Sequence, residues 1–255
     1  TCISSCARMD YFIGAAVSIP GFHVQFPRRV GWSGVQLGET SSPGCRHREG
    51  KEMSVKVAVV GMGYWGRNLV RNFHELGALK VVCDSDESPR STIEESYPDV
   101  GFTTNFDDIL GDDSIHAVAI GAPAVTHHRL AKSALEAGKD VYVEKPLATN
   151  LHDGEELVRL ANQHGRILMV GHILRYHPAV ETLSNLISSG ELGRVQYFYS
   201  NRLNIGKIRT EENILWSFAP HDISVMLALL NEEPASLSCR GEDYRNKGGV
   251  DVTVR

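Results

Sequence analysis

Three closely spaced glycines are the first residues of this chain whose pattern indicates chemistry. Gly61, Gly63 and Gly66 form Gly-x-Gly-x-x-Gly directly after the apolar run 55–60. Between a strand and a helix, the first glycine permits a tight turn and the second lets the backbone approach a diphosphate. The third lets the helix pack against the strand. The diphosphate then lies at the positive end of the helix that begins near Trp65. We therefore predict a dinucleotide site, the alternative being a purely structural glycine turn.

Asp84 closes the next strand, about twenty residues further on, where a carboxylate accepts hydrogen bonds from an adenosine ribose diol. The same carboxylate would repel a 2′-phosphate. The sequence therefore favours NAD over NADP as the cofactor, although Arg67 and Arg90 are close enough in sequence to leave NADP open.

A lysine follows another predicted strand. Glu144, Lys145 and Pro146 come directly after the strand 140–143, so Lys145 lies at the carboxyl edge of the sheet, where α/β proteins bind ligands. Its ammonium group could donate to a substrate oxygen. The alternative is an exposed lysine before a proline turn.

The elements that must position these residues alternate between strand and helix. The short connections between them imply parallel pairing and a doubly wound α/β sheet of the Rossmann type. The predicted strands are 55–60, 79–83, 117–120, 140–143 and 167–170, and the predicted helices are 65–76, 127–137 and 151–164.

The pattern loosens after Gly171, and we expect a second, α+β domain with an open-faced, mainly antiparallel sheet. Helices are predicted at 178–189 and 221–230, and strands at 195–200, 235–239 and 250–254. A sheet of only two or three strands is too small to be complete, so we expect a truncated carboxyl terminus. The expected domains are a cofactor domain at 53–172 and a partial substrate and oligomerisation domain at 173–255.

Residues 1–52 have no sustained periodicity and contain scattered Gly, Pro and Ser. We expect a disordered or non-native extension, with Met53 as the natural start, because a strand follows Met53 directly.

Four segments in this order make the chain resemble the Gfo/Idh/MocA oxidoreductases, over residues 55–255. They are the glycine loop (59–66), the turn Gly-Ala-Pro-Ala-Val-Thr-His (121–127), Glu-Lys-Pro (144–146) and Ala-Pro-His-Asp-Ile-Ser (219–224). The resemblance implies that Lys145 and His221 flank the carbinol that is oxidised. His221 would be the base, because imidazole titrates near working pH, and Lys145 would stabilise the developing oxyanion. The alternative for His221 is a capping or packed histidine.

Within the family, segments 171–178, 201–209 and 215–222 are most similar to the branch of UDP-N-acetyl-2-amino-2-deoxyglucuronate 3-dehydrogenases and related nucleotide-sugar enzymes. This implies oxidation at C3 of a UDP-N-acetylated sugar, with UDP-N-acetylglucosaminuronate as the expected substrate, in polysaccharide biosynthesis (EC 1.1.1.-). Many family members carry an aspartate four residues before the histidine, but this chain has Ser217 there. Asp222 cannot be assumed to replace that aspartate.

The resemblance extends to sets of binding residues. Expected cofactor contacts are Gly61, Gly63, Tyr64, Trp65, Gly66, Asp84, Ala122, Pro123, Thr126, His127, Glu144 and Lys145. Expected substrate contacts are Lys145, Arg175, Tyr176, His177, Asn201, Arg202, Lys207, Arg209 and His221. The guanidinium groups suit a pyrophosphate and a carboxylate, the alternative being a solvated basic face.

Two other functions stay open: a dehydrogenase of an unactivated sugar or cyclitol (or an imine), and a catalytically silent dinucleotide-binding module. A net charge of −5 without a basic block argues against nucleic acid. No run of 18 apolar residues predicts a membrane span. The five cysteines form no Cys-x-x-Cys pair and the histidines show no paired spacing, so we expect no metal and a reducing cytoplasm. We also expect a homo-oligomer when the protein is full length.

Overall fold

The structure is a computed structural model that describes residues 18–19, 22–23, 55–202, 214–242 and 252–253. The chain divides into two compact units, and each is described by itself. The larger comprises residues 54–185 and 205–255, and the smaller comprises residues 1–53 and 186–204.

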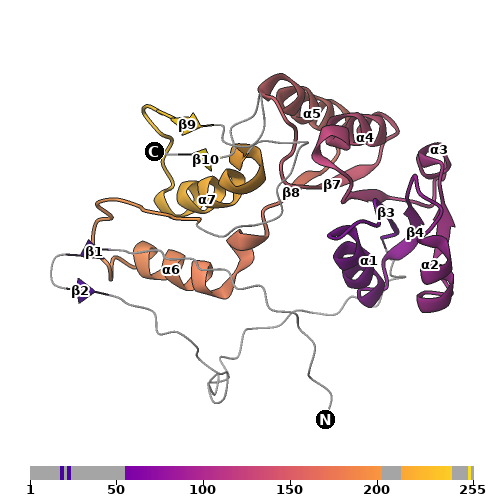
Figure 1. Cartoon of the computed structure of the whole chain (residues 1–255), viewed down its shortest axis with the longest axis horizontal. Coiled ribbons are helices and arrows are strands. Elements are labelled where there is room, and N and C mark those ends of the chain that lie inside the picture. Colours follow the sequence, from indigo (N-terminus) through magenta and orange to yellow (C-terminus); the bar gives the residue numbers. More distant parts are fainter. Residues whose placement is uncertain (1–17, 20–21, 24–54, 203–213, 243–251, 254–255) are drawn as a thin grey trace, which may run out of the picture. The chain divides into compact units, whose positions relative to one another are not determined.

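The larger unit contains a six-stranded sheet, and every neighbouring pair of its strands is parallel (Figure 1). The strand order is β5-β4-β3-β6-β7-β8, so the chain builds outward from the central β3 in both directions. The strands are β3 (Val57–Val60), β4 (Leu79–Cys83), β5 (Gly101–Thr103), β6 (Ala117–Ile120), β7 (Asp140–Glu144) and β8 (Leu168–Gly171). The predicted Rossmann-type sheet is confirmed.

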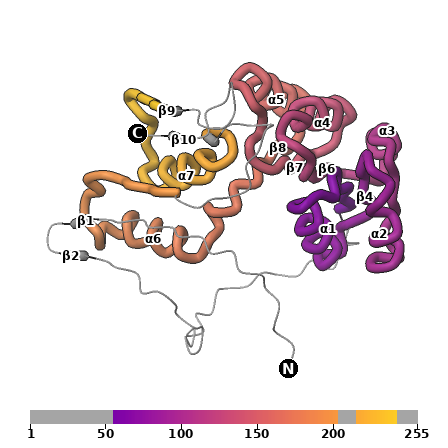
Figure 2. The backbone as a smooth tube through the Cα atoms, in the orientation of Figure 1, coloured from indigo at the N-terminus to yellow at the C-terminus, as the bar shows by residue number. Residues whose placement is uncertain are grey.

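Five helices accompany these strands, and the backbone trace in Figure 2 shows the alternation. They are α1 (Gly66–Glu75), α2 (Arg90–Ser96), α3 (Phe106–Leu110), α4 (Ala124–Glu136) and α5 (Leu151–His164). The ends of α5 follow from local chemistry. The Asn150 side chain accepts a hydrogen bond from the Asp153 amide at 2.9 Å, and Gly165 adopts the left-handed conformation, φ 59°, that favours glycine.

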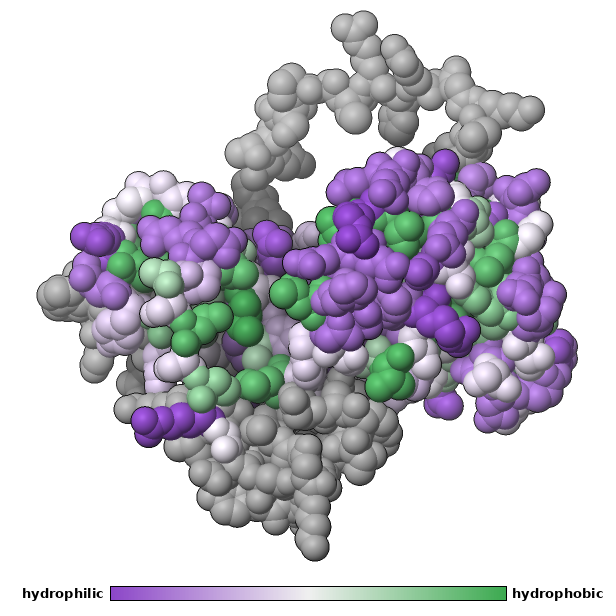
Figure 3. Space-filling view, turned by 90° about the horizontal axis from the view of Figure 1, so that it is seen from above, coloured by the Kyte–Doolittle hydropathy of each residue, from purple (hydrophilic) through white to green (hydrophobic). Residues whose placement is uncertain are grey.

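The sheet is covered on both faces, which is why its central strands β3 and β6 are continuously apolar. Alternate residues of β3 enter different cores. Ala58 and Val60 pack with Leu135 of α4 and Leu157 of α5, whereas Val57 and Val59 pack with residues of α1. The side on which α4 and α5 lie is predominantly hydrophilic at its surface (Figure 3).

Beyond β8 lie a short 3-10 helix, η1 (Ile173–Tyr176), then α6 (Pro178–Ser188) and α7 (Ile214–Leu230). Two antiparallel pairs complete the description: β9 (Gly241–Glu242) with β10 (Val252–Thr253), and β1 (Ser18–Ile19) with β2 (Phe22–His23). None of the described helices is long and apolar enough to cross a membrane.

Three predictions for the second half were wrong in detail. Residues 195–200 and 235–239 form no strand, because an alternating pattern becomes a strand only where a neighbour pairs its backbone. The described residues supply no such neighbour there. Helix α7 begins at Ile214, seven residues before the predicted start, and contains Pro220. The sequence also gave no indication of α2, β5 and α3.

Candidate active site

The glycine loop joins β3 to α1 at the carboxyl edge of the sheet. Gly61 has φ 94°, a left-handed conformation, and a Cβ atom there would lie 2.7 Å from the main-chain nitrogen of Ala122. A Cβ on Gly66 would overlap the carbonyl oxygen of Gly61. These two glycines therefore let the loop, the helix and the neighbouring turn approach one another closely.

Gly63 differs from its neighbours because it is exposed and nothing lies within 4 Å of the place where its Cβ would be. The fold itself does not need glycine at this position. Open space beside a bare backbone at the start of a helix is what a diphosphate group requires, so the loop fits the dinucleotide that the sequence predicts.

Asp84 supports the same loop from the end of β4. Its two carboxylate oxygens accept hydrogen bonds from the amides of Met62, at 2.6 Å, and Asp86, at 2.9 Å. The nearby Arg90 contacts Glu87, Glu94 and the ring of Phe102, so its charge is already balanced. Asp84 is therefore the charged group that the fold fixes beside the glycine loop, which agrees with NAD rather than NADP as the cofactor.

A buried polar cluster connects the glycine loop to the Glu-Lys-Pro segment. The Glu144 carboxylate accepts hydrogen bonds from the indole of Trp65 at 2.6 Å and from the hydroxyl of Tyr142 at 2.7 Å. Burial and the Glu144 carboxylate raise the pKa of Tyr142, so its hydroxyl stays a donor. A Cβ on Gly171 would collide with this cluster. Glu144 thus joins the loop to the strand that ends at Lys145.

The turn at residues 121–127 is fixed by its own side chains. His127 is 1% exposed, and its two ring nitrogens lie 2.7 Å from the carbonyl oxygen of Pro146 and 2.8 Å from that of Ala122. The hydroxyl of Thr126 donates to the carbonyl of Pro123 at 2.7 Å. The His127 side chain therefore holds the turn against the segment that follows Lys145, and we assign it a positioning role.

Lys145 reaches from the end of β7 to helix α7. Its Nζ donates to the carbonyl oxygen of Ser217 at 2.8 Å. His221 lies four residues later, one turn along the same helix, and residues at this spacing share a helix face. Pro220 has no N–H with which to bond the carbonyl four residues earlier, so the helix is loosened in the turn that Lys145 contacts. The predicted catalytic lysine and histidine therefore belong to elements in direct contact.

The predicted substrate contacts are distributed unevenly. Arg175 and Tyr176 lie in η1 and His177 follows it, in the same unit as Lys145, and all three are exposed. Asn201 and Arg202 belong to the smaller unit. Lys207 and Arg209 lie outside the described residues.

Sequence reasoning did not single out His172, which follows β8. Glu144 of β7 pairs with Gly171 of β8, so Lys145 and His172 are the next residues at the ends of adjacent strands. A histidine two residues after the predicted parallel strand 167–170 was the available signal, since ligands bind at that edge.

Other features of the described residues lie away from this edge. A surface hollow is lined by residues that include Lys56, Leu79 and Ser114, near the amino ends of β3, β4 and β6. Burial, followed by the carboxylates of Asp84 and Asp108, raises the pKa of the Cys83 thiol to about 11, which makes it unreactive. Among the described residues no group of three potential ligands could hold a metal ion.

Comparison with known families matches residues 55–172 to the Gfo/Idh/MocA model, described as "Oxidoreductase family, NAD-binding Rossmann fold". Similar curated proteins differ in reaction. A 2,7-anhydro-N-acetylneuraminate hydratase of Mediterraneibacter gnavus is 28% identical to this chain. The match covers 76% of this chain and 54% of the hydratase. Inositol 2-dehydrogenase 1 of Saccharopolyspora erythraea is 30% identical, over 71% of this chain and 56% of the relative. UDP-N-acetylglucosamine 3-dehydrogenase of Acidithiobacillus ferrooxidans is 26% identical, over 73% of this chain and 58% of the relative.

Solved structures share the fold. The chain superposes on yvaA of Bacillus subtilis with a TM-score of 0.68 and 25% identity, over 78% of this chain and 58% of that one. It superposes on GenD2 from gentamicin A biosynthesis, solved in complex with NAD, with a TM-score of 0.62 and 22% identity, over 81% and 62%. The chain spans 43% to 62% of the length of the first three curated relatives, so activities of whole relatives are not transferred to it directly.

Proposed function

Because residues 55–172 belong to the Gfo/Idh/MocA oxidoreductase family as its NAD-binding Rossmann domain, we propose that the chain is part of an NAD-dependent dehydrogenase that oxidises a sugar carbinol. The observation that carries this proposal is the 2.8 Å hydrogen bond from Lys145 to the carbonyl of Ser217. It joins the lysine at the sheet edge to the helix of His221, beside the glycine loop.

In this proposal each residue acts on the hydroxyl group of the substrate. His221 takes the hydroxyl proton as the carbon–oxygen double bond forms. The Lys145 ammonium group hydrogen-bonds the same oxygen and stabilises the negative charge that develops on it. Bound NAD supplies the acceptor for the hydride that leaves the carbinol carbon. The product is a ketone, and the proton and the hydride are both accounted for.

Three groups would hold the cofactor. Gly61, Gly63 and the first turn of α1 receive the diphosphate, and Asp84 accepts hydrogen bonds from the adenosine ribose. Glu144, at the end of β7, and the following Lys145 would also contact the cofactor. The open space at Gly63 supports this arrangement.

We propose a UDP-N-acetylated sugar as the substrate, with oxidation at C3 and UDP-N-acetylglucosaminuronate as the specific candidate. Support comes from the motifs in residues 171–178, from the exposed Arg175, whose charge acts on His172 as that of Lys145 does, and from the similarity to a UDP-N-acetylglucosamine 3-dehydrogenase. A planar guanidinium group binds phosphate and carboxylate in bidentate fashion. We place the protein in the cytoplasm as a homo-oligomer, in the synthesis of polysaccharide sugars.

A second candidate is a dehydrogenase of a free cyclitol, favoured by the 30% identity to an inositol 2-dehydrogenase. The two are separated by following NADH absorbance with NAD and, in turn, UDP-N-acetylglucosaminuronate, UDP-N-acetylglucosamine and myo-inositol. We expect turnover with a UDP-sugar, and lower affinity for it in Arg175→Ala and in high salt.

The chemistry is tested by Lys145→Ala and His221→Asn, each of which should reduce turnover by at least about a hundredfold while NADH still binds. Unchanged rates in both variants would show that the catalytic assignment is wrong. NADH binding without turnover of any substrate would instead favour a catalytically silent module.

A further inference from the structure

His172 occupies a distinctive place at the sheet edge. It is the first residue after β8, and its main-chain amide donates to the carbonyl of Val170 at 2.8 Å. Because Glu144 and Gly171 are register partners, His172 lies beside Lys145 across two adjacent parallel strands. The element it leads into, η1, contacts α7, which carries His221. His172 therefore lies among the elements that form the proposed active site.

One nitrogen of the His172 ring is buried and is not used by the described residues. This nitrogen, Nδ1, has no hydrogen-bond partner among them. A buried polar nitrogen without a partner costs stability, and most such groups in proteins are paired. His127, at the same edge, illustrates the usual situation, since both of its nitrogens lie close to carbonyl oxygens. The unused nitrogen of His172 suggests a partner that arrives with a ligand.

The electrostatic surroundings restrict what that ligand group is. Burial, followed by the positive charges of Arg175 and Lys145, lowers the pKa of His172. The ring is therefore neutral near neutral pH, and a neutral imidazole nitrogen either accepts or donates one hydrogen bond. A hydroxyl group matches it in both cases, because it also donates and accepts. A phosphate or carboxylate would be better served by the charged side chains nearby.

We propose that Nδ1 of His172 forms a hydrogen bond with a sugar hydroxyl, either of the nicotinamide ribose of the cofactor or of the carbohydrate substrate. This inference rests on the proposed function, because it takes Lys145 as the place where cofactor and substrate meet. It adds to that function a binding residue directly after β8, a strand that contributes no catalytic group to the proposed chemistry.

The test compares variants that keep or remove a polar atom at this place. His172→Phe keeps a planar ring without nitrogen, and His172→Asn keeps a polar atom close to the position of Nδ1. Because no described residue uses Nδ1, we expect His172→Phe to be folded, with a melting temperature no lower than that of the unmodified chain. His164→Phe and His164→Asn, at the exposed end of α5, are matched controls that should behave as the unmodified chain.

Two titrations separate the two sources of the hydroxyl. The first measures the Kd of NADH by fluorescence, and the second measures the Kd of UDP-N-acetylglucosaminuronate by calorimetry with NADH saturating. We expect His172→Phe to weaken one of them roughly tenfold and His172→Asn to weaken it less than threefold. A loss in the first titration identifies the nicotinamide ribose, and a loss confined to the second identifies the substrate.

The inference is overturned if both dissociation constants of His172→Phe stay within twofold of the unmodified chain. It is also overturned if His172→Asn and His172→Phe lose the same amount of binding affinity, because Nδ1 is then not the atom that contacts the ligand. Failure of the proposed function is recognised separately, since the unmodified chain itself would then either bind no NADH or bind it without oxidising any of the substrates.

Discussion

Gly63 and Gly66 lie three residues apart in one loop, yet a methyl group at each would meet different surroundings. At Gly66 it would overlap the carbonyl of Gly61, whereas at Gly63 it would point into open space. The fold therefore requires glycine at position 66, and we propose that the ligand requires it at position 63. This distinction separates folding from binding at the scale of single atoms.

We predict that Gly66→Ala lowers the free energy of unfolding by about 1–3 kcal/mol, because main-chain atoms have to move apart. Gly63→Ala should unfold like the unmodified chain but bind NADH at least about tenfold more weakly, since its Cβ would stand where the diphosphate approaches. Thermal melts and NADH titrations of both variants test this. Equal destabilisation by the two substitutions would contradict it.

Asp84 supports the glycine loop, and we propose that it also selects the cofactor. We predict that Asp84→Asn weakens NADH binding about 10- to 100-fold, because a charge-assisted contact to the loop and the ribose contact are both weakened. Its discrimination against NADPH should fall as well, since the repelling charge is gone. Titrations with NADH and NADPH measure the ratio of the two dissociation constants. Asp86→Asn, at an exposed position two residues on, serves as the control, and the same ratio in both variants would argue against selection by Asp84.

Single residues were predictable where their type and spacing carried the chemistry. The glycines, Asp84 and Lys145 each follow a recognisable strand. His172 was not found, because what distinguishes it is burial of one ring nitrogen, and no sequence pattern encodes that. The hydrogen bond between Trp65 and Glu144 joins residues far apart in sequence, and only the packed sheet brings them together.

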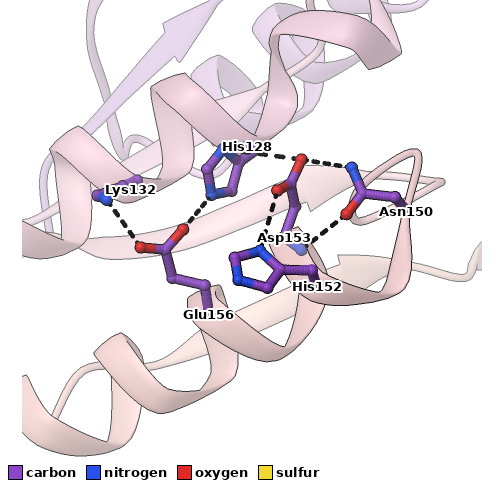
Figure 4. A network of polar contacts seen from close by, with 6 residues as sticks. All are labelled: His128, Lys132, Asn150, His152, Asp153 and Glu156. Carbon is purple, nitrogen blue, oxygen red and sulfur yellow. Dashed lines mark hydrogen bonds and ion pairs between the residues drawn. The ribbon is translucent and has the colours of Figure 1, made fainter.

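At the scale of elements, α4 and α5 are joined by a polar network that the sequence did not indicate. Glu156 accepts from Lys132 and lies against His128, each at 2.7 Å, while Asp153 interacts with Asn150, His128 and His152 (Figure 4). Each interaction joins residues of the two helices or stabilises the first turn of α5. The network lies on the helices that cover one face of the sheet.

This network predicts how stability depends on pH. Hydrogen bonds from Lys132 and His128 lower the pKa of Glu156 from its ordinary 4.5 to about 2. Because the folded-state pKa lies below the unfolded value, the stabilisation is complete above about pH 4.5 and is lost as the pH falls toward 2. The difference in melting temperature between the unmodified chain and Glu156→Gln should therefore be constant at neutral pH and narrow over that range. Glu155→Gln, an exposed neighbour, should show no such narrowing. A difference that persists at the lowest pH would contradict the assignment.

Long buried elements were predictable and short exposed ones were not. Strands β4 and β6 and helix α5 match their predicted bounds, because buried β-branched runs and capped amphipathic segments have strong patterns. Helix α2 buries only Ile93, and β5 has three residues, so neither produces a periodic signal. The start of α7 was misplaced because Pro220 indicates a boundary, whereas the helix continues through it.

At the scale of the whole molecule, the family match and the sheet begin close together, at residues 55 and 57. Every group assigned to the cofactor lies between residues 61 and 145. We therefore predict that a chain beginning at Met53 binds NADH within about twofold of the full chain's Kd and gains the same thermal stabilisation from it. Fluorescence titration and melting curves measure both. A loss of tenfold or more would show that residues 1–52 contribute to the cofactor domain.

The strand order has a consequence for how the sheet can assemble while the chain is being synthesised. The first strand of the sheet to leave the ribosome, β3, becomes its centre, and every later strand is added to an outer edge of those already paired. No strand has to be threaded between two others, so assembly can keep pace with synthesis. The turn that lies against Gly61 is in place once β6 has docked, and Lys145 arrives with the following strand. A nascent chain therefore completes the proposed coenzyme loop before the proposed catalytic lysine is made.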